Sequence, residues 1–195
     1  VMKMPFEGLS LMDYAINTAL AISNIILKKQ DKAGLLTFSD VIGATLKAER
    51  DTGQLKRIME ALYREKERPG EANFELLYEG VRRLIGMRSL LLLFTNFESS
   101  YALERALPTL RRLNRSHLLV VVFFENTEIR KLALEEVQKT ADIYRQTVAR
   151  QFLQEKKEMV TKLRQYGIQG VLTRPEDLTL NTINKYLELK SSGLI

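Results

Sequence analysis

The chain has 195 residues, of which 45% are hydrophobic and 28% charged, the balance of a folded globular protein. It contains no cysteine and a single histidine, which excludes disulfides, thiolate metal centres, cysteine nucleophiles and any site with two imidazoles. The formal net charge of +6 permits an anionic partner, but an excess of this size is also common in ordinary soluble proteins. The length fits one domain, and we expect residues 1–195 to form a single one.

The first third of the chain predicts a helix followed by a hairpin. Hydrophobic periodicity indicates a helix over residues 9–29, with Ser10 as its N-cap. Asp13, Asn17 and Asn24 interrupt this apolar stretch, so a buried helix is favoured over a membrane span. Residues 33–39 are typical of a strand, and the chain turns after them into a second strand over residues 41–48.

Helices and strands alternate along the rest of the chain. Helices are predicted over residues 52–65, 74–84, 101–113, within 135–166, and over 175–189, and strands over 89–95, 118–124 and 168–173. Continuously apolar runs such as residues 118–124 are typical of parallel strands covered on both faces. The pattern predicts an α/β fold of the three-layer, Rossmann-like type, with a mostly parallel sheet and one antiparallel edge strand.

Polar residues follow several of the predicted strands, at the edge of the sheet where α/β folds bind ligands. The same residue types are favoured as helix N-caps, so capping is the competing interpretation at each position. The candidates for a binding rim are Ser39, Asp40, Asn96, Glu98, Glu125 and Asn126.

Sequence signatures of catalysis do not accompany this rim. The glycines form neither GxGxxG nor GxxxxGK. His117 opens an apolar strand at the opposite, amino-terminal edge of the sheet, which argues against a serine triad. The basic residues around 156–164 alternate with acidic ones, as on a solvated helix face. The sequence therefore favours a protein that is not an enzyme, has no cofactor and does not bind nucleic acid.

From residue 9 to residue 126 the order of features resembles a von Willebrand factor A-like domain. It is most similar to the version in the bacterial and archaeal family called domain of unknown function 58. Asp31 to Ser39 (DKAGLLTFS) matches that family's "gDrvGLvtFs" strand and is the most specific part, and residues 90–96 stand in place of "lvllSD". The resemblance covers more than half of the chain, and the part after residue 128 carries no distinctive motif.

The resemblance implies a degenerate metal site. Typical domains of this fold bind Mg²⁺ or Mn²⁺ at a metal-ion-dependent adhesion site made of Ser, Thr and Asp ligands. The corresponding positions here are Val1, Ala72 or Asn73, and Asn96. Hard cations prefer several oxygens including carboxylates, and Asn96 offers a neutral one. We therefore expect no tight metal binding.

The resemblance also implies a central first strand, between the strands that begin at Ala33 and Ser89, which would precede Val1. The chain then corresponds to a domain truncated at its amino-terminal end. Without that strand, two strand edges would lack a partner. A swapped segment, direct pairing of the flanking strands, or a homodimer formed through the unpaired edges would fill the gap.

The function implied by the resemblance is a protein-interaction or scaffold domain that works with a MoxR-type AAA ATPase in the assembly or maturation of other proteins. Members commonly carry upstream transmembrane helices, so we expect a cytoplasmic domain, itself not inserted in the membrane, of a membrane-anchored parent. Two alternatives remain open. One is a Rossmann-like or flavodoxin-like enzyme whose phosphate loop lies upstream of Val1. The other is a binder of anionic surfaces, nucleic acid or membrane, through the basic helix around residues 156–164.

Overall fold

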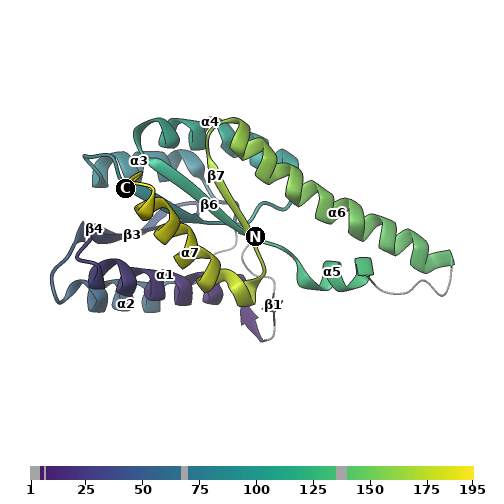
Figure 1. The fold of residues 1–195 in the computed structure, drawn as a ribbon, viewed down its shortest axis with the longest axis horizontal. Coiled ribbons are helices and arrows are strands. Elements are labelled where there is room, and N and C mark those ends of the chain that lie inside the picture. Colours follow the sequence, from purple (N-terminus) through teal and green to yellow (C-terminus); the bar gives the residue numbers. More distant parts are fainter. Residues whose placement is uncertain (1–4, 7, 67–69, 135–139) are drawn as a thin grey trace.

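The computed structural model describes residues 5–6, 8–66, 70–134 and 140–195 (Figure 1). In chain order the elements are β1 (Pro5–Phe6), β2 (Leu9–Ser10), α1 (Leu11–Lys28), β3 (Ala33–Phe38), β4 (Ile42–Glu49), α2 (Gln54–Arg64), α3 (Phe74–Leu84), β5 (Leu90–Phe94), α4 (Ser100–Ser116), β6 (Leu118–Phe124), α5 (Thr127–Leu134), α6 (Thr140–Gln165), β7 (Gln169–Thr173), a 3₁₀ turn (Pro175–Asp177) and α7 (Leu178–Ser191).

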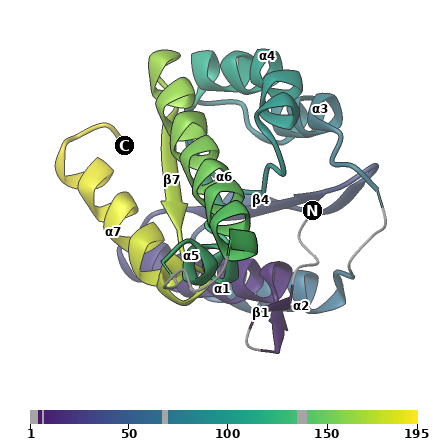
Figure 2. The same ribbon diagram turned by 90° about the vertical axis from the view of Figure 1, so that its right-hand side faces the viewer.

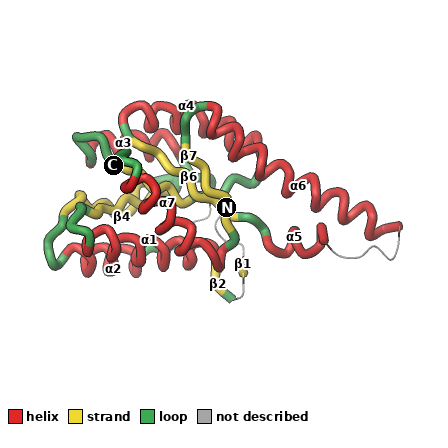
Figure 3. The backbone as a smooth tube through the Cα atoms, in the orientation of Figure 1, coloured by secondary structure: helices red, strands yellow, loops and turns green. Residues whose placement is uncertain are grey.

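The larger strands form two separate groups between layers of helices (Figures 2 and 3). β5, β6 and β7 make a parallel sheet in the order β5-β6-β7, and β3 pairs with β4 in an antiparallel hairpin. The predicted α/β class and the mostly parallel strand arrangement are confirmed. Direct pairing of β3 with β5, one of the ways in which the gap was expected to close, does not occur in the described part of the chain.

Two hydrophobic clusters cover the two faces of the parallel sheet. Leu119, Val121 and Phe123 of β6 pack into a cluster with residues of α3, α4 and α6. Val120 and Val122 face the other way, toward α1 and α7. Every residue of β6 is buried, which explains why its sequence is continuously apolar rather than alternating.

The β3–β4 hairpin lies in the same layer as the parallel sheet. Leu36 and Phe38 of β3 pack against the cluster under α3 and α4, whereas Ala33 and Leu35 pack with α1 and α2. Successive side chains of a strand point to opposite faces. β3 is therefore covered by helices on both faces, as β5 and β6 are, although no backbone hydrogen bond joins it to β5 among the described residues.

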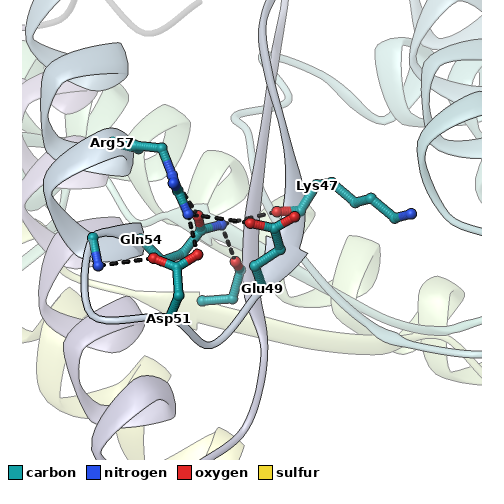
Figure 4. Close-up of polar contacts among 7 residues, drawn as sticks. Lys47, Glu49, Asp51, Gln54 and Arg57 are labelled. Atoms are coloured by element: carbon teal, nitrogen blue, oxygen red, sulfur yellow. Dashed lines mark hydrogen bonds and ion pairs between the residues drawn. The ribbon is translucent and has the colours of Figure 1, made fainter.

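A polar latch fastens α2 to the hairpin (Figure 4). The buried Gln54, in the first turn of α2, donates from Nε2 to the carbonyl oxygens of Ala33 (2.7 Å) and Lys47 (2.8 Å). Its Oε1 accepts from Arg57 Nε (3.0 Å), and Arg57 also pairs with Glu49 (3.1 Å) and with Asp51. One amide side chain thus ties both strands of the hairpin to the helix beneath them.

Local sequence signals explain most of the helix boundaries. Ser10 caps α1, accepting from the backbone N–H of Asp13 (3.2 Å), while the Asp13 carboxylate accepts from the N–H of Ser10 (2.8 Å). This reciprocal pair is a capping box. The separate helix α5 was not predicted. Hydrophobic spacing predicts that Leu178, Leu180, Ile183 and Leu187 of the last helix face inward. This prediction is partly wrong, because Leu180 and Leu187 are exposed and the buried residues are Leu178, Thr182, Tyr186 and Leu189.

In Figure 1, α6 extends well beyond the sheet, and α5 lies beside its outer part. Arg150 of α6 donates to the carbonyl oxygen of Ala133 in α5 (3.4 Å). Among the residues that the structure describes, no helix combines the length and the apolar character needed to cross a lipid bilayer.

Candidate functional site: a groove between two strands and its polar rim

A cavity of about 1580 Å³ lies between β3 and β5, and we call it the inter-strand groove. Its walls include residues 33–39 of the hairpin and residues 89–94 of the parallel sheet. Ala15, Ala19 and Ile22 of α1 line one face, and Leu77 and Val81 of α3 line the other. The groove exceeds the roughly 300–1,000 Å³ of typical small-molecule sites, so its dimensions suit a segment of polypeptide better than a metabolite.

The strands on the two sides of the groove run in the same direction. A row of rings joins their carboxyl ends, with ring centroids 5.6 Å apart for Phe38 and Phe74 and 5.8 Å apart for Phe74 and Phe97. At the other end, Asp31 precedes β3 and accepts a hydrogen bond from Tyr186 (2.6 Å), late in α7. Since α7 begins just beyond the carboxyl end of β7, its last turns lie at the amino-terminal edge of the sheet.

Asp31, which belongs to the motif that carries the family resemblance, holds the start of β3 in place. Hydrogen bonds from Lys190 and Tyr186 lower the pKa of its carboxyl group. Its role in this structure is to connect the hairpin to α7 at the end of the groove away from the rim. The motif therefore marks a structural contact here rather than a ligand-binding one.

Within the described part of the chain, the edge of β5 that faces the groove has backbone groups without a strand partner. The N–H of Leu118 donates to the carbonyl of Ser89 (2.9 Å), and the N–H of Thr95 donates to that of Val122 (3.0 Å). Backbone groups alternate in direction along a strand, so the odd-numbered residues of β5 bond to β6. The N–H and C=O groups of Leu90, Leu92 and Phe94 then point toward the groove. Both neighbouring strands thus have one edge free in the described structure.

The predicted rim residues divide into two sets. Ser39, Asn96 and Glu98 line the same end of the groove, together with Ala72 and Asn73 from the loop before α3. Asp40 accepts from the hydroxyl of Ser39 (2.7 Å) and is exposed. The second set, Glu125 and Asn126, follows β6 and does not line the groove.

Capping accounts for two of the polar residues at this edge. The side chain of Asn73 accepts from the N–H groups of Glu75 (3.1 Å) and Leu76 (3.2 Å) at the start of α3. Asn126 in the same way accepts from the N–H groups of Glu128 and Ile129 (both 3.0 Å) at the start of α5. Their amide oxygens are committed to helix ends, which supports the structural interpretation of these positions.

A buried lysine is hydrogen-bonded to the rim residue Asn96. Lys156 of α6 is 3% exposed, and its ammonium donates to Asn96 Oδ1 (3.2 Å) and to the carbonyl oxygen of Phe97. Burial lowers its pKa to about 8, although the nearby carboxylates of Glu155 and Glu98 oppose the shift. Glu155 also accepts from the N–H of Ser100 (2.7 Å), which fixes this part of α6 against the start of α4.

The interpretation of residues 156–164 as a solvated basic face is therefore wrong for Lys156. A sequence signal for its burial does exist, because Lys156 shares a helical stripe with the buried Met159 and Leu163. In the same segment Lys162 pairs with Glu104 across to α4. Lys156 and Lys162, two of the cations with which this helix would bind an anionic surface, thus already contact other groups of the protein.

The positions of the degenerate adhesion site do not converge on a set of anionic ligands. Ala72 and Asn73 lie at the rim, and Asn96 accepts a hydrogen bond from the Lys156 ammonium. Val1 lies outside the described residues. Across residues 5–6, 8–66, 70–134 and 140–195, no group of three or more His, Cys, Asp and Glu side chains is arranged to hold a metal ion.

His117 lies at the amino-terminal edge of the sheet, as predicted, and not at the rim. It is 6% exposed, and its backbone N–H donates to the carbonyl of Leu113 (2.9 Å) at the end of α4. Burial, and secondarily the charge of Arg88, lowers the pKa of its imidazole.

Comparison with protein-family models and with curated proteins found no match to this chain.

Proposed function

We propose that this chain is a non-enzymatic protein-interaction domain whose contact surface is the rim around Ser39, Asp40, Asn96 and Glu98, and which works without a divalent metal. The observation that supports the proposal most directly is the Lys156 ammonium bound to Asn96 Oδ1 and to the Phe97 carbonyl. This group places a positive charge, supplied by the protein itself, directly against Asn96 of the rim.

A divalent cation at the rim would compete with the Lys156 ammonium for Asn96 Oδ1. A divalent ion that bound to Asn96 would lie within a few ångströms of the ammonium, and a divalent and a monovalent cation about 4 Å apart repel by about 8 kcal/mol at an effective dielectric constant of 20. The amide and carbonyl oxygens that remain are neutral ligands, which hold Mg²⁺ poorly without carboxylates. The rim is therefore expected to bind divalent metal ions weakly and to make its contacts without one.

A calorimetric titration with Mg²⁺ and Mn²⁺ tests the metal-free part of the proposal. We expect no heat of binding for the 195-residue chain at about 1 mM metal, the weak end of protein affinities for hard cations. The Asn96→Ala variant is titrated as the control. Micromolar affinity in the native chain that disappears in this variant would show a working metal site and overturn the proposal.

We propose a MoxR-type AAA ATPase as the protein partner, on the ground of the family resemblance. Asp40 and Glu98 are exposed carboxylates at the rim, and reversing their charge changes the contact surface without altering the core. The variant Asp40→Lys/Glu98→Lys is expected to lower the affinity for the purified ATPase by at least about tenfold, since rim charges govern encounter and specificity. Binding is measured by interferometry, with equal results expected in EDTA and in Mg²⁺.

The matched control reverses two exposed carboxylates that are not part of the rim, Glu60→Lys/Glu79→Lys, so that the net charge changes equally. This control is expected to bind the ATPase like the native chain. Equal loss of affinity in both variants would indicate a non-specific charge effect. If the native chain does not bind the ATPase, the proposal that this ATPase is the partner is wrong.

A further inference from the structure

We propose that a second, smaller cavity, at the amino-terminal edge of the parallel sheet, binds a phosphate-like oxyanion between Arg82, Arg88, Ser116 and His117. This cavity has a volume of about 260 Å³, below the roughly 300–1,000 Å³ of typical small-molecule sites, so it suits an inorganic anion or a single phosphate group. It lies at the opposite edge of the sheet from the rim, and the proposal is independent of what the rim binds.

The cavity lies where α3 and α4, which pack side by side, both end (Figure 2). Arg82 comes from the last turn of α3, and Ser116 is the last residue of α4. The parallel pairing of β5 with β6 starts at the first residue of each strand. The residues just ahead of the two strands, among them Arg88 and His117, are therefore neighbours in the wall of the cavity.

The charged side chains in this wall are cationic. Among the described residues that line the cavity, none is an aspartate or a glutamate. Arg82 and Arg88 have no ion-pair partner in the described part of the chain, whereas the adjacent Arg83 pairs with Glu79 (3.7 Å). A guanidinium group presents several N–H donors in one plane, in a geometry that matches the oxygens of phosphate. Two such groups at one cavity are suited to a doubly charged oxyanion.

His117 adds an imidazole whose hydrogen-bonding groups lack partners. The residue is 6% exposed, its Nδ1 is buried without a hydrogen-bond partner, and its side chain makes no hydrogen bond to another described residue. Buried polar side chains nearly always have a partner, so an unpartnered imidazole in a cavity wall points to a ligand. Burial and the charge of Arg88 lower its pKa, and an anion beside both groups would oppose this shift.

The loop between α3 and β5 adds backbone donors at the same place. The N–H groups of Gly86, Met87 and Arg88 do not donate to any backbone group that the structure describes. A Cβ atom built on Gly86 would meet no other atom within 4 Å, so the loop is open on that side. Successive backbone N–H groups next to cations are a common component of anion sites.

Helix dipoles are the competing explanation for these arginines. The carboxyl-terminal ends of α3 and α4 carry partial negative charge, which a nearby guanidinium stabilises. The same partial charges weaken the attraction for an anion, so we expect a dissociation constant of about 1 mM rather than tight binding. Only a ligand site predicts that an added oxyanion changes the titration of His117.

The experiment uses His117, the single histidine of the chain, as its reporter. The pKa of its imidazole is measured from the ring-proton NMR signals in sodium sulfate and in sodium chloride at equal ionic strength. Sulfate is chosen because it stays doubly charged throughout the titration. We expect the pKa to be higher by about one unit in saturating sulfate, which corresponds to about tenfold tighter binding of the anion to the protonated imidazole.

Two variants and a matched control test the arginines. Arg82→Gln and Arg88→Gln should each weaken sulfate binding at least about fivefold, because each removes a charge-assisted hydrogen bond. Arg83→Gln removes an equal charge from the same turn of α3, but Arg83 does not line the cavity, so this control should bind sulfate like the native chain. Circular dichroism checks the folding of each variant, and either of the two lining variants suffices for the comparison.

A further titration distinguishes two sources of the same chemical group. Inorganic phosphate and O-phosphoserine are compared at one pH through the amide signals of residues 86–88. Tighter binding of phosphoserine would assign the cavity to a phosphate monoester, and tighter binding of inorganic phosphate would assign it to the free anion. Both results support an oxyanion site.

Two results would overturn the proposal. The same pKa of His117 in sulfate and in chloride would show that no oxyanion occupies the cavity. Equal weakening of sulfate binding by Arg83→Gln and Arg88→Gln would show attraction to the positive surface as a whole rather than to this cavity.

Discussion

Replacing Gln54 by leucine is expected to lower the free energy of unfolding by about 2–5 kcal/mol, because two carbonyl groups lose their only side-chain donor in the latch. Leucine fills a similar volume but offers no hydrogen bond to the carbonyls of Ala33 and Lys47, which Gln54 Nε2 now contacts at 2.7 and 2.8 Å. Arg57 also loses the Oε1 acceptor. Urea denaturation followed by circular dichroism measures the change.

Two control variants separate the latch from general effects on α2. Gln54→Glu keeps an acceptor for Arg57 but removes both donors, so it should be destabilised nearly as much as the leucine variant. Lys56→Ala alters an exposed ion pair to Glu60 at 3.9 Å and should change stability by less than about 1 kcal/mol. A leucine variant as stable as Lys56→Ala would show that the latch contributes little.

Lys156 should give the chain an unusual alkaline rise in stability. Its pKa is about 8 in the folded chain, against an ordinary value of 10.5. Between these two pH values the unfolded chain holds a proton that the folded chain has released, so stability increases with pH across this window. Below pH 8 both states are protonated, and burial of the ammonium costs up to about 3 kcal/mol relative to pH 10.5. In the variant Lys156→Met this rise should disappear.

The measurement is urea denaturation at several pH values between 7 and 11 for the native chain and two variants. Lys157→Met removes the neighbouring exposed lysine and should keep the rise, because only the buried ammonium is desolvated. If the native and Lys156→Met chains show the same dependence of stability on pH, the rise does not come from the lowered pKa of Lys156. At pH 7 the variant also leaves Asn96 Oδ1 and the Phe97 carbonyl without this donor, which partly offsets the relief of the buried charge.

The sequence predicts most of the secondary structure because local signals are strong in this chain. Residues 74–84 and 118–124 form their predicted helix and strand with no change in boundary, since an N-cap asparagine and a continuous apolar run mark them clearly. The last helix shows where such reasoning fails. Its leucines at 180 and 187 suggested an inward face, but the contact of Tyr186 with Asp31 turns a different face toward α1.

The candidate site was only partly predictable. The rim follows from the position of polar residues after strands, whereas direct pairing of β3 with β5, one of the expected ways to close the gap between them, does not occur among the described residues. The burial of Lys156 depends on contacts with Asn96 and Phe97, which are about sixty residues away in sequence. The separation of the sheet into two groups is likewise a property of long-range packing, which local hydrophobic patterns do not encode.

The separation of the β3–β4 hairpin from the parallel sheet has a consequence for the rim. Side-chain packing, including the ring contacts of Phe74 with Phe38 and Phe97, joins these two parts, whereas no ladder of backbone bonds does so in the described chain. Ser39 and Asn96 belong to different parts, so their spacing depends on how the parts are held. A rim ligand that contacts both residues would therefore favour the packing of the hairpin against the parallel sheet that gives the spacing it fits.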